Sequence, residues 1–178
     1  LNIGEGAGLF VLERAEGGVQ LLGVGESSDA HHMSAPDPQG RGGALAISGA
    51  LQKAMLTPED IQYVNLHGTG TRLNDEIEAR VMHTIFENPP PCSSTKPLTG
   101  HCLGASGALE AGVCWLALSK AADYNDRIPL PPHWWDGEAD ESFPELSLTQ
   151  TGQSLPAQGD ICMMSSSFAF GGNNVALV

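Results

Sequence analysis

The feature that most constrains the fold is the alternation of short apolar runs with longer amphipathic segments along the chain. Apolar runs of four to eight residues have the length of buried strands, whereas apolar residues spaced three or four apart over a dozen positions indicate helices. Strands that alternate with helices in this way predict an α/β fold. We expect strands at 9–13, 20–25, 61–66, 92–95, 161–165 and 175–178, and helices at 44–55, 74–86 and 104–122.

Composition and charge exclude several classes of protein. The 178 residues carry 21 acidic and 8 basic side chains, a formal charge of −13, and 41% of them are hydrophobic. A chain of ~100–200 residues is typical of one domain with a core of its own. The acidic balance argues against a nucleic-acid-binding surface, which would need clustered Lys and Arg. No apolar run approaches the ~18 residues of a membrane-spanning helix, so we expect neither nucleic acid nor a membrane as a partner.

The ends and the cysteines of the chain suggest where the protein is found. The first residues show no basic stretch followed by an apolar one, so no secretory signal is expected and the cytoplasm is the predicted compartment. The four cysteines lie far apart without a CxxC pair, which favours small buried thiols in a reducing compartment over disulfides or zinc. The chain does not begin with Met, and we expect it to belong to something larger.

Polar residues beside glycines follow three of the expected strands. His67 comes after one strand, Lys96 and His101 come after the next, and the pair Gly171 and Gly172 comes after a third. Ligands bind at such strand ends in open α/β sheets, so residues from distant parts of the sequence are expected to form one site. The other four histidines are expected to be structural, and no metal site is expected because His83 lacks a second ligand at i+4. They are His31, His32, His83 and His133.

Two imidazoles and one ammonium group suggest a particular chemistry. Neutral imidazoles donate N–H hydrogen bonds, and two donors aimed at one oxygen form an oxyanion site. A nearby ammonium disfavours imidazolium by like-charge repulsion, so Lys96 would keep His67 and His101 neutral near pH 7. Such a site suits an enolate formed from a thioester, for example when a malonyl group loses carbon dioxide. Thr69 and Thr71, which follow His67, could bind the amides of a long polar arm.

The same regions contain longer motifs, namely NLHGTGT at 65–71, SSTK to TGH at 93–101 and SFAFGGNN at 167–174. Together with GEGAG at 4–8 and SSDAHHM at 27–33, they resemble the elongating β-ketoacyl-acyl carrier protein synthases from end to end. These condensing enzymes have the thiolase fold, so the resemblance implies an α/β chain that is the C-terminal half of a thiolase-like fold. The complete fold has αβαβα layers.

The resemblance also implies a domain organisation and an activity. Residues 1–178 would form a C-terminal ketosynthase domain, with the last strands of the N-terminal half in 1–26 and the C-terminal half in 27–178. The parent protein would be an acyltransferase that condenses an acyl group with malonyl-acyl carrier protein and releases carbon dioxide. No cofactor is expected, because the substrate is carried on the phosphopantetheine of the carrier protein.

The residues that match the motifs receive expected roles. His67 and His101 would bind the malonyl thioester carbonyl and stabilise the enolate, and Lys96 would order them beside Glu110, a buried structural partner. The backbone N–H of Phe170 would supply half of an oxyanion hole while its ring gates the acyl pocket. The remaining positions are Thr69, Thr71 and, more weakly, Ser34 for the phosphopantetheine arm, and Phe168, Gly171 and Gly172 for the oxyanion and gate loop.

The sequence also departs from the family pattern. Ala169 stands where the family usually has Gly, and its Cβ would restrict the backbone of the gate; Asn173 replaces a usual Thr or Ser. Nothing matches the family's nucleophilic Cys, and Cys102 is not expected to replace it because it lacks an elbow and a base. Asp75 and Glu78 are expected on a solvated or structural helix face rather than as catalytic acids.

Partners follow from these departures. The missing N-terminal half would supply the nucleophile and the surface for the acyl carrier protein, and the complete protein would be a homodimer or a ketosynthase heterodimer. This chain alone is expected to be inactive. A second hypothesis is a non-catalytic partner subunit that sets chain length, although the retained His67, Lys96 and His101 favour an enzyme. A thiolase-like enzyme acting on coenzyme A esters is a third.

Overall fold

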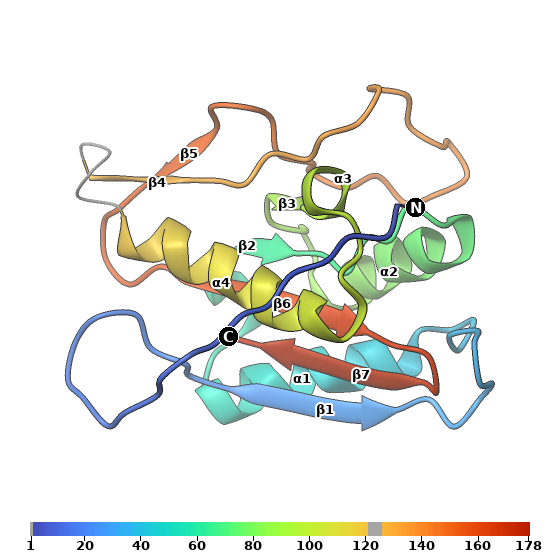
Figure 1. Ribbon diagram of the computed structural model, residues 1–178, viewed down its shortest axis with the longest axis horizontal. Coiled ribbons are helices and arrows are strands. Elements are labelled where there is room, and N and C mark those ends of the chain that lie inside the picture. The colour runs from blue at the N-terminus through green and yellow to red at the C-terminus, as the bar shows by residue number, and fades with distance from the viewer. Residues whose placement is uncertain (1, 121–125) are drawn as a thin grey trace.

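A five-stranded mixed sheet forms the centre of the computed structural model, in the order β1-β7-β6-β2-β3 (Figure 1). β2 (Ile61–Asn65) pairs in parallel with β3 (Cys92–Ser93) on one side and with β6 (Cys162–Phe168) on the other. β7 (Asn173–Leu177) is antiparallel to both β6 and β1 (Val24–Ser28). The parallel strands β2, β3 and β6 therefore end at one edge of the sheet, as expected for a ligand site.

Helices cover both faces of this sheet (Figure 1). α1 (Arg41–Ala54) and α2 (Arg72–Ile85) pack on one face, and α4 (Ser106–Ser119) packs on the other. None of the helices in the described part of the chain has both the length and the apolar character to span a bilayer. The shorter elements are η1 (Pro58–Asp60), α3 (Lys96–Thr99), η2 (Leu103–Ala105), β4 (Arg127–Pro129) and β5 (Ser154–Pro156).

Side chains alternate along the central strands between two hydrophobic cores. Val64 and Met164 lie in the core beneath α1 and α2, whereas Tyr63 and Met163 lie in the core beneath α4. All four are buried, as the two-residue period of a strand covered on both faces requires. This arrangement confirms the α/β class and gives three layers, helix–sheet–helix.

The structure describes residues 2–120 and 126–178. The helices expected at 44–55 and 74–86 are confirmed as α1 and α2, and α4 begins two residues later than expected. Its expected end at 122 lies outside the described residues. The boundary expected at residue 26 falls inside β1, and the division of the chain into 1–26 and 27–178 stays a prediction.

The strand expected at 9–13 is wrong. These residues are irregular, and the side chains of Leu9 and Val11 are 93% and 89% exposed. β-propensity gives a strand only where a partner strand lies alongside, and no described strand does so here. The segment instead runs along α4, with Gly8 beside Ala108 and the Phe10 ring beside Gly112 (Figure 1). The strand expected at 20–25 is present as β1, shifted to begin at Val24.

The close approach of β1 to α1 gives a prediction about stability. A Cβ added at Gly25 would lie 1.8 Å from the carbonyl oxygen of Ala46, whereas one added at Gly49 would lie 3.5 Å from the Gly25 Cα. Gly25→Ala should therefore destabilise the protein by about 2–3 kcal/mol. Gly49→Ala in α1 should raise stability by about 0.5–1 kcal/mol.

Thermal unfolding of the two variants measures the difference. Each kcal/mol shifts Tm by about 2–4 °C in a domain of this size, so the two melting temperatures should separate by about 5–15 °C. Equal melting temperatures would contradict the packing of α1 on β1.

Candidate active site

The loop that follows β2 is held in place from two directions. The backbone N–H groups of His67 and Gly68 both donate to the carboxylate of Glu78, each at 2.7 Å. The Ser94 hydroxyl donates to the carbonyl of Gly68 at 2.7 Å. Gly68 has φ +39°, and an added Cβ would lie 2.4 Å from the Cβ of Ser94. Only glycine fits here without strain, and it lets β2 and β3 bring His67 close to Ser94.

Lys96 lies at the centre of the site and is only 4% exposed. Its ammonium pairs with the buried carboxylate of Glu110 on α4 and donates to the carbonyl of His67. The Nδ1 atom of His67 lies 3.4 Å from the same ammonium. Three elements therefore meet at one buried charge, which confirms the proximity of Lys96, Glu110 and His67 expected from the sequence.

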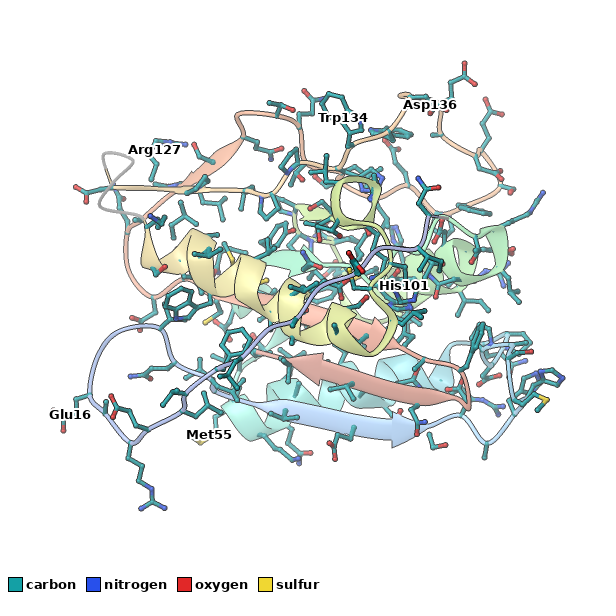
Figure 2. All side chains as sticks on the ribbon, in the orientation of Figure 1. Glu16, Met55, His101, Arg127, Trp134 and Asp136 are labelled. Atoms are coloured by element: carbon teal, nitrogen blue, oxygen red, sulfur yellow. The ribbon has the colours of Figure 1, made fainter. Side chains whose placement is uncertain are left out.

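His101 lies beside His67, between the N-terminal segment and α4 (Figure 2). The two ring centroids are 5.4 Å apart and the ring planes are nearly perpendicular, at 84°. The backbone of His101 is held by Asn2 and Gly4, through hydrogen bonds of 2.8 and 3.1 Å. Its Nδ1 lies 2.8 Å from the Ser106 hydroxyl and accepts the backbone N–H of Leu103 at 3.3 Å.

These contacts determine where the proton sits on each imidazole. A lysine ammonium can only donate, so the Nδ1 of His67 accepts from Lys96. The Nδ1 of His101 likewise accepts from a backbone N–H. In a neutral ring the remaining nitrogen then carries the hydrogen, so both histidines present Nε2–H as a donor. The site thus holds two adjacent neutral N–H donors.

The environment keeps both rings neutral. Burial lowers the pKa of His67 to about 3, and the charge of Lys96 and the neighbouring His101 act in the same direction. Burial, followed by repulsion from Lys96, also lowers the pKa of His101. Burial raises the pKa of the Glu110 carboxyl, while the Lys96 ammonium beside it opposes that rise. The only charges among these groups are the ion pair, and the imidazoles act as uncharged donors.

Glu78 has a larger part in the site than the sequence analysis assigned to it. Its side chain is 3% exposed and accepts two hydrogen bonds from the His67 loop, so of the two expected positions, a solvated or a structural helix face, the structure gives the structural one. Burial raises its pKa to about 7, against the two N–H donors and Lys96. The sequence does indicate this burial, because Glu78 lies on the same face of the helix as Ile77 and Val81, at the spacing of residues that face the core. Asp75 is half-buried, and burial raises its pKa.

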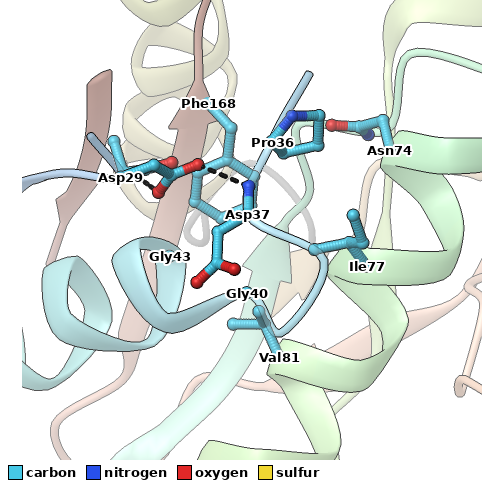
Figure 3. A pocket seen from close by; sticks show the side chains of 10 residues that line it. Asp29, Pro36, Asp37, Gly40, Gly43, Asn74, Ile77, Val81 and Phe168 are labelled. Carbon is cyan, nitrogen blue, oxygen red and sulfur yellow. Dashed lines mark hydrogen bonds between the residues drawn. The ribbon is translucent and has the colours of Figure 1, made fainter. Parts of the chain in front are cut away.

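The turn between β6 and β7 borders the site. The ring of Phe168 lies 5.9 Å from that of His67 and, with Asp29 and Ile77, lines a small cavity (Figure 3). Phe170 is 81% exposed. In this turn the backbone N–H groups of Ala169, Gly171 and Gly172 donate hydrogen bonds to backbone carbonyls. The N–H of Phe170 makes no such bond to the described residues. Ala169 is not among the residues with positive φ, so its Cβ meets no left-handed strain, and its effect on the freedom of the gate stays a prediction.

The other expected residues are only partly brought together. The hydroxyls of Thr69 and Thr71 lie 2.8 Å apart on the loop that follows His67. Ser34 is exposed, lies by the His32 ring, and makes no hydrogen bond to either threonine. The Sγ atom of Cys102 packs 3.8 Å from backbone carbonyls and has no imidazole partner in the described residues. That Cys102 is not the nucleophile stays a prediction.

No group of three or more His, Cys, Asp or Glu side chains suited to a metal ion occurs in the described ranges. Three buried oxygens there lack a hydrogen-bond partner: Asn65 Oδ1, Glu110 Oε2 and Ser166 Oγ. Buried oxygens of this kind are ordinarily satisfied by ordered water or by a cation.

Comparison with known proteins agrees with this geometry. Residues 19–122 match the family "Beta-ketoacyl synthase, C-terminal domain". The chain is 36% identical to 3-oxoacyl-[acyl-carrier-protein] synthase 2 of Synechocystis, over 98% of this chain and 42% of that protein. It is 38% identical to the mitochondrial 3-oxoacyl-[acyl-carrier-protein] synthase of Arabidopsis thaliana, over 99% and 39%. The chain thus spans about two-fifths of the length of these curated relatives.

A solved structure gives the same result. The ketosynthase ApeO in complex with its chain length factor ApeC, from Xenorhabdus doucetiae, superposes with a TM-score of 0.77 at 55% identity. The match covers 88% of this chain and 37% of that one. These findings confirm the resemblance carried by the motifs and the thiolase-like fold. The chain belongs to the β-ketoacyl synthase family and corresponds to its C-terminal domain.

Proposed function

We propose that this chain is the decarboxylating half of a β-ketoacyl-acyl carrier protein synthase. The observation that carries the proposal is the pair of neutral imidazoles, His67 and His101, whose rings lie 5.4 Å apart and whose Nδ1 atoms are both engaged as acceptors. Two Nε2–H donors side by side can bind one oxygen. An acyl carrier protein is the proposed substrate carrier, as the names of the curated relatives say of them.

The geometry supports the following step. The carbonyl oxygen of the malonyl thioester accepts hydrogen bonds from both Nε2–H groups. When the bond between the malonyl carboxylate and its α-carbon breaks, carbon dioxide leaves and the electron pair forms an enolate. Charge grows on the bound oxygen, where a preorganised donor is worth about 3–4 kcal/mol. The enolate carbon then attacks the carbonyl carbon of the acyl thioester, which is held on a thiol outside this chain. The carbon–sulfur bond breaks as the new carbon–carbon bond forms, and the sulfur leaves as a thiolate.

The rest of the substrate is assigned to the surrounding loops. Thr69 and Thr71 are the proposed contacts of the phosphopantetheine arm, since their hydroxyls lie together on the loop that follows His67, and Ser34 is the weakest of the three candidates. The N–H of Phe170 is the proposed oxyanion donor for the acyl group, and its exposed ring is the proposed gate. No cofactor is proposed, because the substrate would be carried on the phosphopantetheine arm.

The surface supports a larger assembly. Large apolar side chains are exposed along the N-terminal segment and α4, among them Leu9, Val11, Trp115 and Leu116. The N-terminal segment runs along α4, and exposed apolar side chains that gather on one surface mark an interface. We propose that the remaining part of the protein covers it, and that the complete protein forms a homodimer or pairs with a chain length factor, as ApeO does.

A non-catalytic chain-length subunit is the alternative, and the ApeO complex contains a chain length factor. A scaffold has less need of a buried Lys96–Glu110 pair that fixes the tautomer of His67 beside a second imidazole donor, His101. The complete protein should therefore decarboxylate malonyl-acyl carrier protein. Failure to do so, with an intact fold, would support the scaffold.

Replacing His67 or His101 by Ala tests the two roles. Each change removes one oxyanion donor, so the decarboxylation rate of the complete protein should fall about 10²–10³-fold. Acylation of its nucleophile should remain measurable, because neither ring is proposed to act in that step. His83→Ala, at an exposed histidine on α2, is the control. Decarboxylation by His101→Ala at the parental rate would refute the assignment.

Replacing Glu78 by Gln tests the two hydrogen bonds by which its carboxylate holds the His67 loop. An amide offers one acceptor oxygen and turns an NH₂ toward the second N–H, so one buried donor loses its partner. We expect a loss of about 1–3 kcal/mol in unfolding free energy and a slower decarboxylation step. Glu76→Gln, which changes only a surface pair with Arg80, should cost less than about 0.5 kcal/mol. Equal effects of the two changes would contradict the role of Glu78 in holding the His67 loop.

Removing the buried charge tests the electrostatics. In the double variant Lys96→Met with Glu110→Gln, the repulsion that lowers the pKa of both histidines is absent. Both pKa values should rise toward about 6.5, so the rings take up protons at higher pH than in the parent. Side-chain NMR titration of His67 and His101 measures the change. Unchanged pKa values would show that burial alone keeps the rings neutral.

A further inference from the structure

His133 holds the main chain that supports the catalytic loops. It lies in the irregular segment after β4, where its backbone N–H donates to the carbonyl of Thr149 at 2.9 Å. Its Nδ1 accepts the backbone N–H of Ser94 at 3.1 Å. The ring packs edge-on against Trp135, with centroids 5.9 Å apart. The imidazole is thus fixed on one side and hydrogen-bonded on the other.

Ser94 connects this imidazole to the site. Its hydroxyl donates to the carbonyl of Gly68 at 2.7 Å and accepts the backbone N–H of Lys96 at 3.3 Å. The Cβ of Ser94 also packs directly under Gly68. Ser94 therefore positions both the loop that carries His67 and the first residue of α3. Whatever moves its backbone moves both loops.

The hydrogen bond to Ser94 requires a neutral ring with its proton on Nε2. A proton on Nδ1 would set two donors face to face, and the contact would be lost. Burial lowers the pKa of His133, which favours the neutral ring, while Asp75 on α2 acts in the opposite direction. The other groups that contact His133, namely Ser94, Thr149 and Trp135, carry no charge.

We propose that His133 is a positioning residue for decarboxylation, whose Nδ1 holds Ser94 and, through it, Gly68 and Lys96 in the arrangement that the reaction needs. This inference rests on the proposed function. It makes the site sensitive to acid at a group that does not touch the substrate. The hydrogen bond from the Ser94 N–H to the Nδ1 of His133 is fully formed above the ordinary histidine pKa of about 6.5. It is lost as the pH falls through the pKa of His133 in the folded protein, which is lower.

Two substitutions in the complete protein separate the acceptor from the packing. His133→Phe keeps a ring but has no acceptor, so kcat for decarboxylation of malonyl-acyl carrier protein should fall about tenfold with KM unchanged. His133→Asn retains an acceptor oxygen near the position of Nδ1 and should restore kcat to within about twofold of the parent. His83→Phe, at an exposed histidine bonded to the Glu145 carbonyl, is the control and should change neither constant.

The pH profile gives a second readout. The asparagine does not titrate, so His133→Asn should lose less activity than the parent as the pH falls below the ordinary histidine pKa of about 6.5. The proposal is overturned if His133→Phe retains the parental kcat, if His133→Asn is as slow as His133→Phe, or if the acid limb of His133→Asn matches that of the parent.

Hydrogen exchange distinguishes this proposal from the proposed function. Peptides that contain Ser94 should exchange faster in His133→Phe than in His133→Asn or in the parent, measured at one pH by mass spectrometry. This readout needs no activity, so a parent protein without decarboxylation would refute the proposed function while the exchange rates still decide the contact. Equal exchange in all three proteins would overturn the role of His133.

Discussion

The rest of the site depends on the buried ion pair between Lys96 and Glu110. Taking two charges out of water costs several kcal/mol per ion unless the geometry supplies other partners. Lys96 has three hydrogens, and three acceptors face its ammonium: the Glu110 carboxylate, the His67 carbonyl and the His67 Nδ1. Because these acceptors come from α4 and from the loop after β2, the charge is stable only when both elements are in place. The pair thereby joins folding to the construction of the site.

The ion pair also explains why two histidines can work as donors without carrying charge. Lys96 occupies the Nδ1 of His67 and repels a second positive charge, while the start of α4 occupies the Nδ1 of His101. Each ring is left with one nitrogen that can donate to a substrate, as an Nε2–H. Glu78 adds a second anchor from the opposite layer, because α2 reaches the same loop from the other face of the sheet. The two helical layers meet across the sheet end at His67.

Sequence reasoning located the elements and most of the site, and its errors have physical causes. His67, Lys96 and His101 follow strands and lie beside glycines, so the topology of an α/β sheet predicts their meeting. For Glu78 the sequence left a solvated and a structural position open, because an acid on a helix is usually solvated although its stripe faces the core. The strand expected at 9–13 depended on local propensity, which does not reveal a missing partner strand. The contact between His133 and Ser94 spans 39 residues, and no local pattern predicts it.

The cysteines show how the chemistry is divided. Cys92 and Cys114 are buried, and burial raises the pKa of each thiol to about 12, so neither forms a thiolate near neutral pH. Cys102 packs against backbone carbonyls without an imidazole to remove its proton. The described residues therefore offer donors for an enolate oxygen but no activated sulfur for an acyl group. In the proposed function condensation needs both, and the acyl-bearing nucleophile would come to the His67–His101 pair from outside the described residues.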